Sequence, residues 1–161
     1  MMLICIGSDT MAKNLDRIDR KILNILQKDA RISIKDIANQ VFLSSPAVLV
    51  RLKRLEEDGY IEGYHAQLNL EQLGMNIKAF IKVNLHAKNR PEFLKYVEST
   101  TNVVASYTIT GDYALLLEVI FDSMKNLDSF IQELQVYGET KTDIVFLTSF
   151  ENRSLELSED K

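Results

Sequence analysis

The sequence predicts an α+β protein with two domains: a helical N-terminal third and a larger part in which strands and helices follow the order βαββαβ. Apolar residues recur at helical spacing from residue 15 to about residue 58. From residue 77 onward, runs with alternating apolar and polar residues, typical of strands, are separated by two helical segments. The length of 161 residues is enough for one domain or two small ones.

The first two helices of the N-terminal third are marked by their starting residues. Residues 15–29 (LDRIDRKILNILQKD) have apolar side chains at helical spacing, and Asp16 can cap the start, with Asp19 three residues later. Ser33, followed by Asp36 at the same distance, begins a short second helix.

The third helix is predicted over residues 46–58. Serine before proline is a good helix start, because the hydroxyl accepts a free backbone N–H and proline has none to lose. Gly59 ends the helix. Residues 60–64 then alternate as a strand that continues to Leu68, and this strand can form a wing.

The third helix has two different faces. Its predicted buried stripe consists of Val48, Leu49, Leu52 and Leu55. The outer face holds small residues first and cations later, namely Ala47, Val50, Arg51 and Arg54. Such a face fits a DNA groove, where Arg51 can reach base edges while Lys53 and Arg54 meet phosphates. Ser44 and Ser45, with the free N–H groups of the helix start, can hold a phosphate oxygen.

The charge distribution supports a charged partner for the first third. The chain has a net charge of −4, but residues 13–64 hold ten Lys/Arg against eight Asp/Glu, whereas residues 65–161 hold nine against fourteen. The alternative is a three-helix bundle that only packs. A very short second helix, a tight turn and a capped third helix with a cationic outer face favour a helix-turn-helix that binds DNA.

These residues also resemble a known family. LDRIDRKILNILQKDARIS and SSPAVLVRLKRLEEDGYIEGY are similar to the winged helix-turn-helix of the Lrp/AsnC, or feast/famine, transcription regulators from Leu15 to Leu70. The resemblance implies that residues 34–53 bind DNA, with Ser44 at the entrance of the recognition helix. The family often has an acidic or polar residue where this chain has Val50, which implies a different sequence preference.

The second part of the chain is predicted element by element from its periodicity. The elements are strand 77–87, helix 90–100, strand 103–110, a turn at Gly111-Asp112, strand 113–121, helix 123–136 and strand 142–152. This order is that of a ferredoxin-like sheet with both helices on one face. The family resemblance implies the same domain.

The strand over residues 113–121 is apolar on both faces. Tyr113 and Leu115 lie on one face, while Ala114 and Leu116 lie on the other. A sheet covered by helices on one side should be polar on the other unless something covers it. Scattered apolar surface residues are the alternative. We expect a homodimer, and the resemblance implies assembly of four dimers into an octamer.

The resemblance also places a small-molecule effector, such as an amino acid, near the turn between the second and third strands, between dimers. Relatives typically read G-D-x-D-Y there, whereas this chain has Ala114 and Leu115 in place of the second aspartate and the aromatic residue. The predicted effector-binding residues are Thr110, Gly111, Asp112, Tyr113 and Ala114. With one carboxylate fewer around the ligand's ammonium, we expect a more apolar amino acid or none. A plain hairpin turn explains these residues equally well.

Enzyme chemistry is not indicated. The two histidines, His65 and His86, have no cysteine nearby, so we expect no metal site, and no cofactor motif or catalytic residue is recognisable. We therefore predict a sequence-specific DNA-binding regulator and not an enzyme. Two alternatives stay open: an architectural DNA-binding protein without effector, and an enzyme resembling the tetrapyrrole decarboxylases of this layout.

The predicted organisation is a tail (1–12), the DNA-binding domain (13–64), a linker (65–76), the ferredoxin-like domain (77–152) and a polar tail (153–161). A single cysteine excludes a disulfide framework and favours the cytoplasm. No apolar run approaches the length of a membrane span, so we expect no membrane partner.

Overall fold

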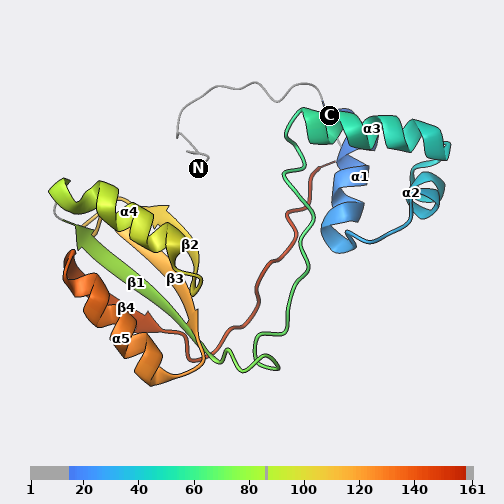
Figure 1. The fold of residues 1–161 in the computed structure, drawn as a ribbon. Helices are drawn as coiled ribbons and strands as arrows, with labels where there is room; N and C mark the ends of the chain where they lie inside the picture. The colour runs from blue at the N-terminus through green and yellow to red at the C-terminus, as the bar shows by residue number, and fades with distance from the viewer. Residues whose placement is uncertain (1–14, 86, 159–161) are drawn as a thin grey trace. The chain divides into compact units, whose positions relative to one another are not determined.

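The computed structural model describes residues 15–85 and 87–158 (Figure 1). The chain divides into two compact units. The first unit comprises residues up to Ala66 together with those from Phe150 onward, and the second comprises Gln67–Ser149. The predicted tail 1–12 and His86 lie outside the described residues.

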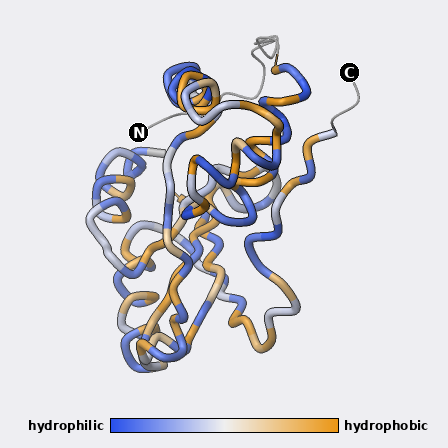
Figure 2. The backbone as a smooth tube through the Cα atoms, turned by 90° about the vertical axis from the view of Figure 1, so that its right-hand side faces the viewer, coloured by the Kyte–Doolittle hydropathy of each residue, from blue (hydrophilic) through white to orange (hydrophobic). Residues whose placement is uncertain are grey.

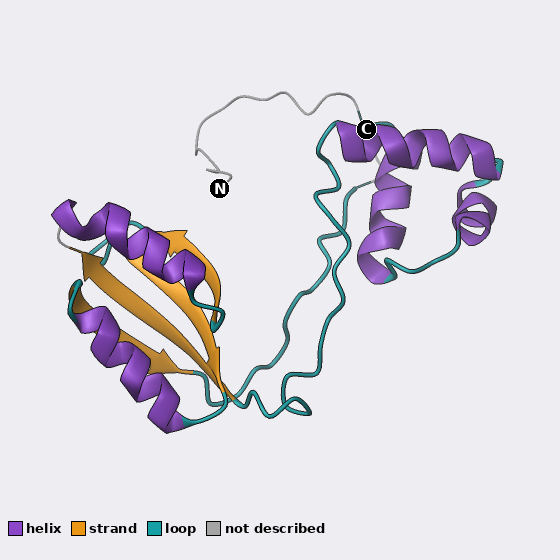
Figure 3. Cartoon of the chain, in the orientation of Figure 1, coloured by secondary structure: helices purple, strands orange, loops and turns teal. Residues whose placement is uncertain are grey.

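The first unit contains three helices, α1 (Arg17–Lys28), α2 (Ile34–Val41) and α3 (Ser45–Glu57) (Figure 3). Each predicted cap is present. Asp16 and Asp19 form a reciprocal capping box at the start of α1, and the Ser33 hydroxyl accepts the Asp36 N–H at 3.1 Å.

The core of the first unit lies where the three helices meet. Hydrophobic and hydrophilic residues are interspersed along the helical parts of the chain (Figure 2), and each of the three helices buries one stripe. The buried apolar residues are Ile22, Leu23, Ile37, Ala38, Val41, Val48, Leu52 and Leu55. Leu49, predicted to be buried, is instead 52% exposed, because it lies about a quarter of a turn from Val48 and outside the contact with α1 and α2.

The predicted wing strand is absent. Residues 61–69 follow α3 without helix or strand. Tyr60 and Ile61 pack against the core, and beyond them the side chains are exposed. A strand needs a neighbour to accept and donate its backbone hydrogen bonds, and the described residues of the first unit form no second strand.

The second unit is the predicted α+β domain with the order βαββαβ. Its elements are β1 (Ile77–Leu85), a short 3₁₀ turn (Ala87–Asn89), α4 (Arg90–Ser99), β2 (Val103–Thr108), β3 (Leu115–Phe121), α5 (Met124–Gln135) and β4 (Gly138–Ile144). The antiparallel sheet has the order β2-β3-β1-β4, which is ferredoxin-like. Both helices pack on the same face of the sheet (Figure 1).

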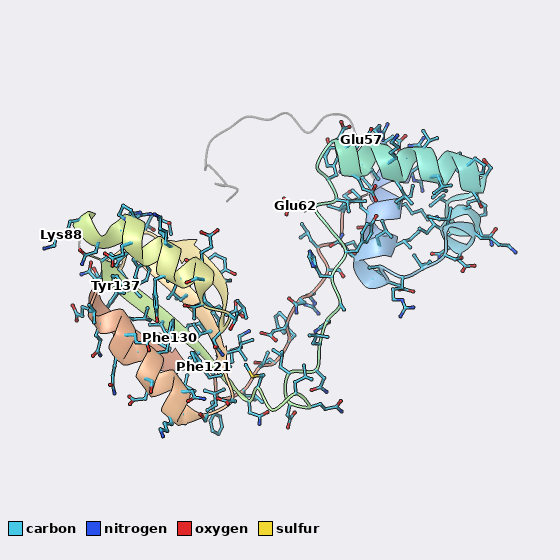
Figure 4. All side chains as sticks on the ribbon, viewed as in Figure 1. Glu57, Glu62, Lys88, Phe121, Phe130 and Tyr137 are labelled. Atoms are coloured by element: carbon cyan, nitrogen blue, oxygen red, sulfur yellow. The ribbon has the colours of Figure 1, made fainter. Side chains whose placement is uncertain are left out.

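The core of the second unit lies between that face and the two helices. Alternate residues of β1 and β3 point into it, as period-two patterning predicts. Aromatic side chains pack beside α5, where the rings of Phe121 and Phe130 lie 5.4 Å apart (Figure 4). The ring of Tyr137 meets that of Phe93 edge-on at 5.4 Å.

The last strand is shifted from its predicted position. β4 covers Gly138–Ile144 instead of 142–152. Ile144 already pairs with Ala79, near the start of β1, so later residues have little strand left to pair with. At the other end, a Cβ on Gly138 would lie 2.2 Å from the carbonyl oxygen of Asn84, so the strand can begin there only with glycine.

Candidate DNA-binding surface

The turn between α2 and α3 delivers the start of α3 to the surface. Phe42 ends α2 in the left-handed conformation (φ 57°) with its side chain 89% exposed. Ser44 then caps α3, its hydroxyl accepting the Ala47 N–H at 3.4 Å. Ser44 is exposed and Ser45 half-buried. The remaining free N–H groups of the first turn make this end attractive to an anion such as a phosphate.

The outward face of α3 begins apolar and ends cationic. Val50 lies nearly opposite the buried Val48 and is 71% exposed, while Ala47 is half-buried beside it. Lys53 is exposed and pairs only loosely with Glu57, at 3.6 Å. This face therefore offers close approach near its start and positive charge one turn further on.

Arg51 lies at the side of this face and is held by α1. Its Nη1 donates to Oδ2 of Asp16 at 2.6 Å and to Oδ1 of Asp19 at 2.7 Å. The Arg51 side chain is 25% exposed. We predicted that Arg51 reaches base edges, but the structure engages its guanidinium within the protein, so such a contact would have to compete with two carboxylates.

Asp19 joins both arginines of α3 to the start of α1. Its Oδ2 accepts from Nη2 of Arg54 and from the backbone N–H of Asp16. Among the residues that the structure describes, Asp19 is the charged side chain that is fully buried. Arg54 remains 48% exposed, so it can bind Asp19 and still present part of its guanidinium outside.

The network changes the ionisation of its members. Partial burial acts to raise the pKa of Asp16, but the Asp19 N–H and the Arg51 guanidinium outweigh it and hold that pKa below its usual value. Burial acts to lower the pKa of Arg51, yet its bonds to Asp16 and Asp19 raise it. Asp16 and Arg51 are therefore both charged at neutral pH.

Sequence reasoning missed this network. The sequence predicts only a cap for α1 from the two aspartates, and they do form this cap. The sequence feature that could have indicated the network is the presence of two acidic residues at the start of one helix and of two arginines, three residues apart, on another. Nothing in the spacing showed that these groups meet across 32 residues of chain.

The predicted effector turn lies at the tip of the β2–β3 hairpin. The Ile109 N–H donates to the Ala114 carbonyl at 3.0 Å and closes the loop. Gly111 has a φ of 115°, a conformation that favours glycine. Thr110, Gly111 and Asp112 are exposed, while Tyr113 and Ala114 are half-buried. The five predicted residues thus lie together on one loop.

A separate hollow of about 440 Å³ lies beside α4 and α5. Phe121 and Phe130 line it, as do Tyr96 and Glu133, and the Tyr96 hydroxyl donates to the Glu133 carboxylate. Burial and the neighbouring Glu133 carboxylate raise the pKa of Tyr96. The predicted effector residues do not line this hollow.

The sheet face opposite the helices mixes apolar residues with internal ion pairs. Lys78 lies 2.5 Å from Glu118, and Lys82 lies 2.7 Å from Asp143. Phe80 and Leu116 lie on the same face. Further apolar side chains are exposed around it and in the chain segments that enter and leave the sheet, namely Leu68, Leu73, Val104, Tyr107, Ile144, Phe146 and Leu147.

Among the described residues, no cluster of His, Cys, Asp or Glu has the arrangement of a metal site. Within the same residues, no helix is long and apolar enough to cross a bilayer.

Comparison with known families gives two matches. Residues 15–62 match a winged helix-turn-helix DNA-binding model, and residues 78–155 match the Lrp/AsnC ligand-binding domain. The chain is 33% identical over 132 residues to the HTH-type transcriptional regulator LrpA of Bacillus subtilis, covering 81% of this chain and 97% of that protein. It is 34% identical over 146 residues to the leucine-responsive regulatory protein of Serratia marcescens, covering 86% and 89%.

Solved structures of transcription regulators are similar to this chain as well. B. subtilis LrpC superimposes with a TM-score of 0.82 at 26% identity, covering 87% of this chain and 99% of that one. A Neisseria meningitidis transcriptional regulator in complex with L-Met gives 0.83 at 27% identity, covering 91% and 98%. Both parts of the chain and nearly the whole length of these proteins are matched. The chain therefore belongs to the Lrp/AsnC family of DNA-binding transcription regulators.

Proposed function

We propose that this regulator binds specific DNA sequences by placing α3 in the major groove. The observation that carries the proposal is the outward face of α3, with exposed Val50 near its middle and exposed Lys53 and Arg54 in the following turn. A helix presented by a short α2 and a tight turn is the usual recognition element of such readers.

Within this face we assign separate roles. Ala47 and Val50 contact base edges, and the Val50 methyl groups suit the methyl group of thymine. Lys53 and Arg54 meet phosphates, as do Ser44 and Ser45 at the helix start. Arg51 keeps its hydrogen bonds to Asp16 and Asp19. These bonds support a role for Arg51 in orienting α3 on α1.

We propose a homodimer formed through the second unit. The sheet face opposite the helices contains Phe80 and Leu116, with its charges already paired to each other. Phe146 and Leu147, beyond the end of β4, are both largely or fully exposed. An apolar surface of this kind is unusual on a monomer, and a second copy of the same sheet would cover it.

Dimerisation is also needed for affinity. One helix-turn-helix unit with a small positive charge makes few phosphate contacts and binds weakly at physiological salt. Two copies held together gain effective concentration and read two half-sites about one helical turn apart, or a multiple of that distance. We propose further assembly of four dimers into an octamer.

We propose an apolar amino acid as the effector, bound between dimers at residues 110–114. Asp112 is exposed on that loop and can accept the ligand's ammonium group. The similar Neisseria regulator was solved with L-Met, an apolar amino acid, which supports this class of ligand.

Selection of binding sites from a random DNA pool tests the function. We expect enrichment of one motif with two related half-sites and at least about a thousandfold preference over random DNA. An architectural protein would enrich no motif and bind both pools equally, which would refute sequence-specific regulation.

A further inference from the structure

The C-terminal segment lies against α1, where two side-chain amides hold its backbone. Asn24 Nδ2 donates to the Leu157 carbonyl at 2.9 Å, and the Leu157 N–H donates to Asn24 Oδ1 at 2.9 Å. The Gln27 side-chain amide makes the same two hydrogen bonds with the backbone of Leu155, each 3.0 Å long. Each side-chain amide thus makes the pair of backbone hydrogen bonds that a neighbouring strand would make. Leu155 and Leu157 are alternate residues of an extended segment, so their backbone groups point to the same side, toward the helix.

The residues that hold the segment share one face of α1. Arg20, Asn24 and Gln27 are spaced four and three residues apart, which aligns them along the helix. The Arg20 guanidinium lies 3.4 Å from the Ser158 carbonyl, and the Ser154 hydroxyl donates to the Gln27 carbonyl at 3.1 Å. We call Arg20, Asn24 and Gln27 the docking strip.

Leu157 adds an apolar anchor. It is half-buried and packs against the core of the first unit, whereas the polar contacts of the strip are made to backbone atoms. Because the two amide pairs satisfy both the N–H and the C=O of their partners, the segment leaves none of these four backbone groups without a partner. The strip therefore recognises an extended chain with leucine at the right position.

The docked segment gives the first unit a second covalent connection to the sheet. The linker enters the sheet at Ile77, the start of β1, and the chain leaves it at Ile144, the end of β4. These strands are antiparallel neighbours, with Ala79 opposite Ile144, and the Val145 N–H donates to the Lys78 carbonyl at 2.9 Å. Both connections therefore start from the same end of two neighbouring strands.

A second connection changes the motion that is available to the DNA-binding unit. Residues 67–76 alone, as a flexible linker, would allow end-to-end distances of about 17 Å with free rotation. Residues 145–153 are held by β4 at one end and by the docking strip at the other, and a unit with two tethers has less rotational freedom than a unit with one.

We propose that the docking strip and residues 154–158 form a clasp that restricts the DNA-binding unit and so fixes the half-site spacing that a dimer accepts. This inference rests on the proposed binding of paired half-sites by a dimer.

Amide hydrogen exchange on the full chain tests the docking. In the native protein we expect the Leu155 and Leu157 amides to exchange at least about tenfold more slowly than in the double variant Asn24→Leu/Gln27→Leu. Asn39→Leu, which changes an exposed amide on α2, is the matched control and should leave both amides protected. Equal exchange in native protein and double variant would overturn the docking.

A series of DNA sites tests the consequence. When half a helical turn is inserted between half-sites, the native protein should lose at least about tenfold in affinity, and the double variant less than about threefold. Identical losses in a double variant whose tail amides exchange freely would overturn the clasp. Failure of the native protein to bind any paired site would instead overturn the proposed function, and with it the role in spacing.

Discussion

Arg51 on α3 donates a 2.7 Å hydrogen bond to Asp19 on α1, and the Asp19 carboxylate is fully buried. A buried carboxylate without a cation would carry a large desolvation cost, so the position of α3 is tied to the position of this arginine. The same carboxylate binds Arg54 one turn later. The two contacts fix both the rotation of α3 about its axis and its distance from α1.

Removing the charge at Asp19 should therefore destabilise the first unit. We expect Asp19→Asn to lower the free energy of unfolding by about 1–3 kcal/mol, because the arginines lose a charged partner in a buried site. Urea unfolding followed by circular dichroism measures the change. Lys53→Gln, which breaks the exposed pair with Glu57, should cost no more than about 0.5 kcal/mol. Equal losses in both variants would contradict a special role for Asp19.

The pKa of Asp16 predicts a dependence of stability on pH. The folded state holds that pKa below its unfolded value of about 3.9, so the stabilisation is complete well above that pH and is lost as pH falls through the folded value. The difference in unfolding free energy between native protein and Asp16→Asn should be constant near neutral pH and shrink below about pH 4. A constant difference down to about pH 2 would show that Asp16 is not shifted.

Val50 and Lys53 should affect DNA binding in different ways. We expect Val50→Ala to lose about 1 kcal/mol on the selected site and to relax the preference for thymine at one position, because methyl contacts are removed. Lys53→Gln should weaken binding to all sequences and reduce the slope of affinity against salt by about 1. Binding titrations with base-substituted sites at several salt concentrations separate the two effects. A sequence-independent loss in Val50→Ala would place Val50 away from the bases.

The elements of this fold could be predicted from periodicity because each buries one stripe or one face. Ser33 and Ser44 marked helix starts correctly, since a cap is a local interaction between residues three apart. The prediction of a strand at residues 60–68 was wrong. A strand also needs a neighbouring strand to pair with, and its own sequence does not specify one. β4 was misplaced because the apolar run at 144–147 has the pattern of a strand, although β1 begins only at Ile77 and leaves most of that run without a strand to pair with.

The site was only partly predictable for the same reason. The outward positions of Val50 and Lys53 follow from helical geometry and are exposed in the structure. The partners of Arg51 depend on how α1 packs against α3, which periodicity within one helix does not encode. The docking of Leu155 and Leu157 on α1 involves their backbone atoms. The pattern of side chains therefore predicted only a polar tail and indicated no contact with α1.

Assembly can be tested on the open face of the sheet. We expect the native protein to be a dimer or a larger multiple of dimers by light scattering at micromolar concentration. Leu116→Asp places an unpaired charge in the proposed interface and should shift the protein to monomer, whereas Gln132→Asp, on the exposed side of α5, should not. A native monomer would refute the dimer, and an unchanged mass for Leu116→Asp would place the interface elsewhere.

The effector prediction depends on Asp112. An amino acid brings an ammonium group that must be matched by a carboxylate or by several acceptors when it is buried between subunits. On the loop 110–114 the side-chain acceptors are the Asp112 carboxylate and the hydroxyls of Thr110 and Tyr113, and the half-buried Ala114 beside them adds only a methyl group. Such a site should favour ligands whose remaining part is apolar, because a polar side chain would lose its water without a partner.

Calorimetric titration with a panel of amino acids measures this preference. We expect leucine or methionine to bind more tightly than asparagine or aspartate, and Asp112→Asn to weaken the best ligand by about tenfold, since one charge-assisted hydrogen bond is lost. Asp128→Asn, an exposed aspartate on α5, serves as the control and should bind like the native protein. Tight binding of a polar amino acid that Asp112→Asn leaves undiminished would place the effector site away from this loop.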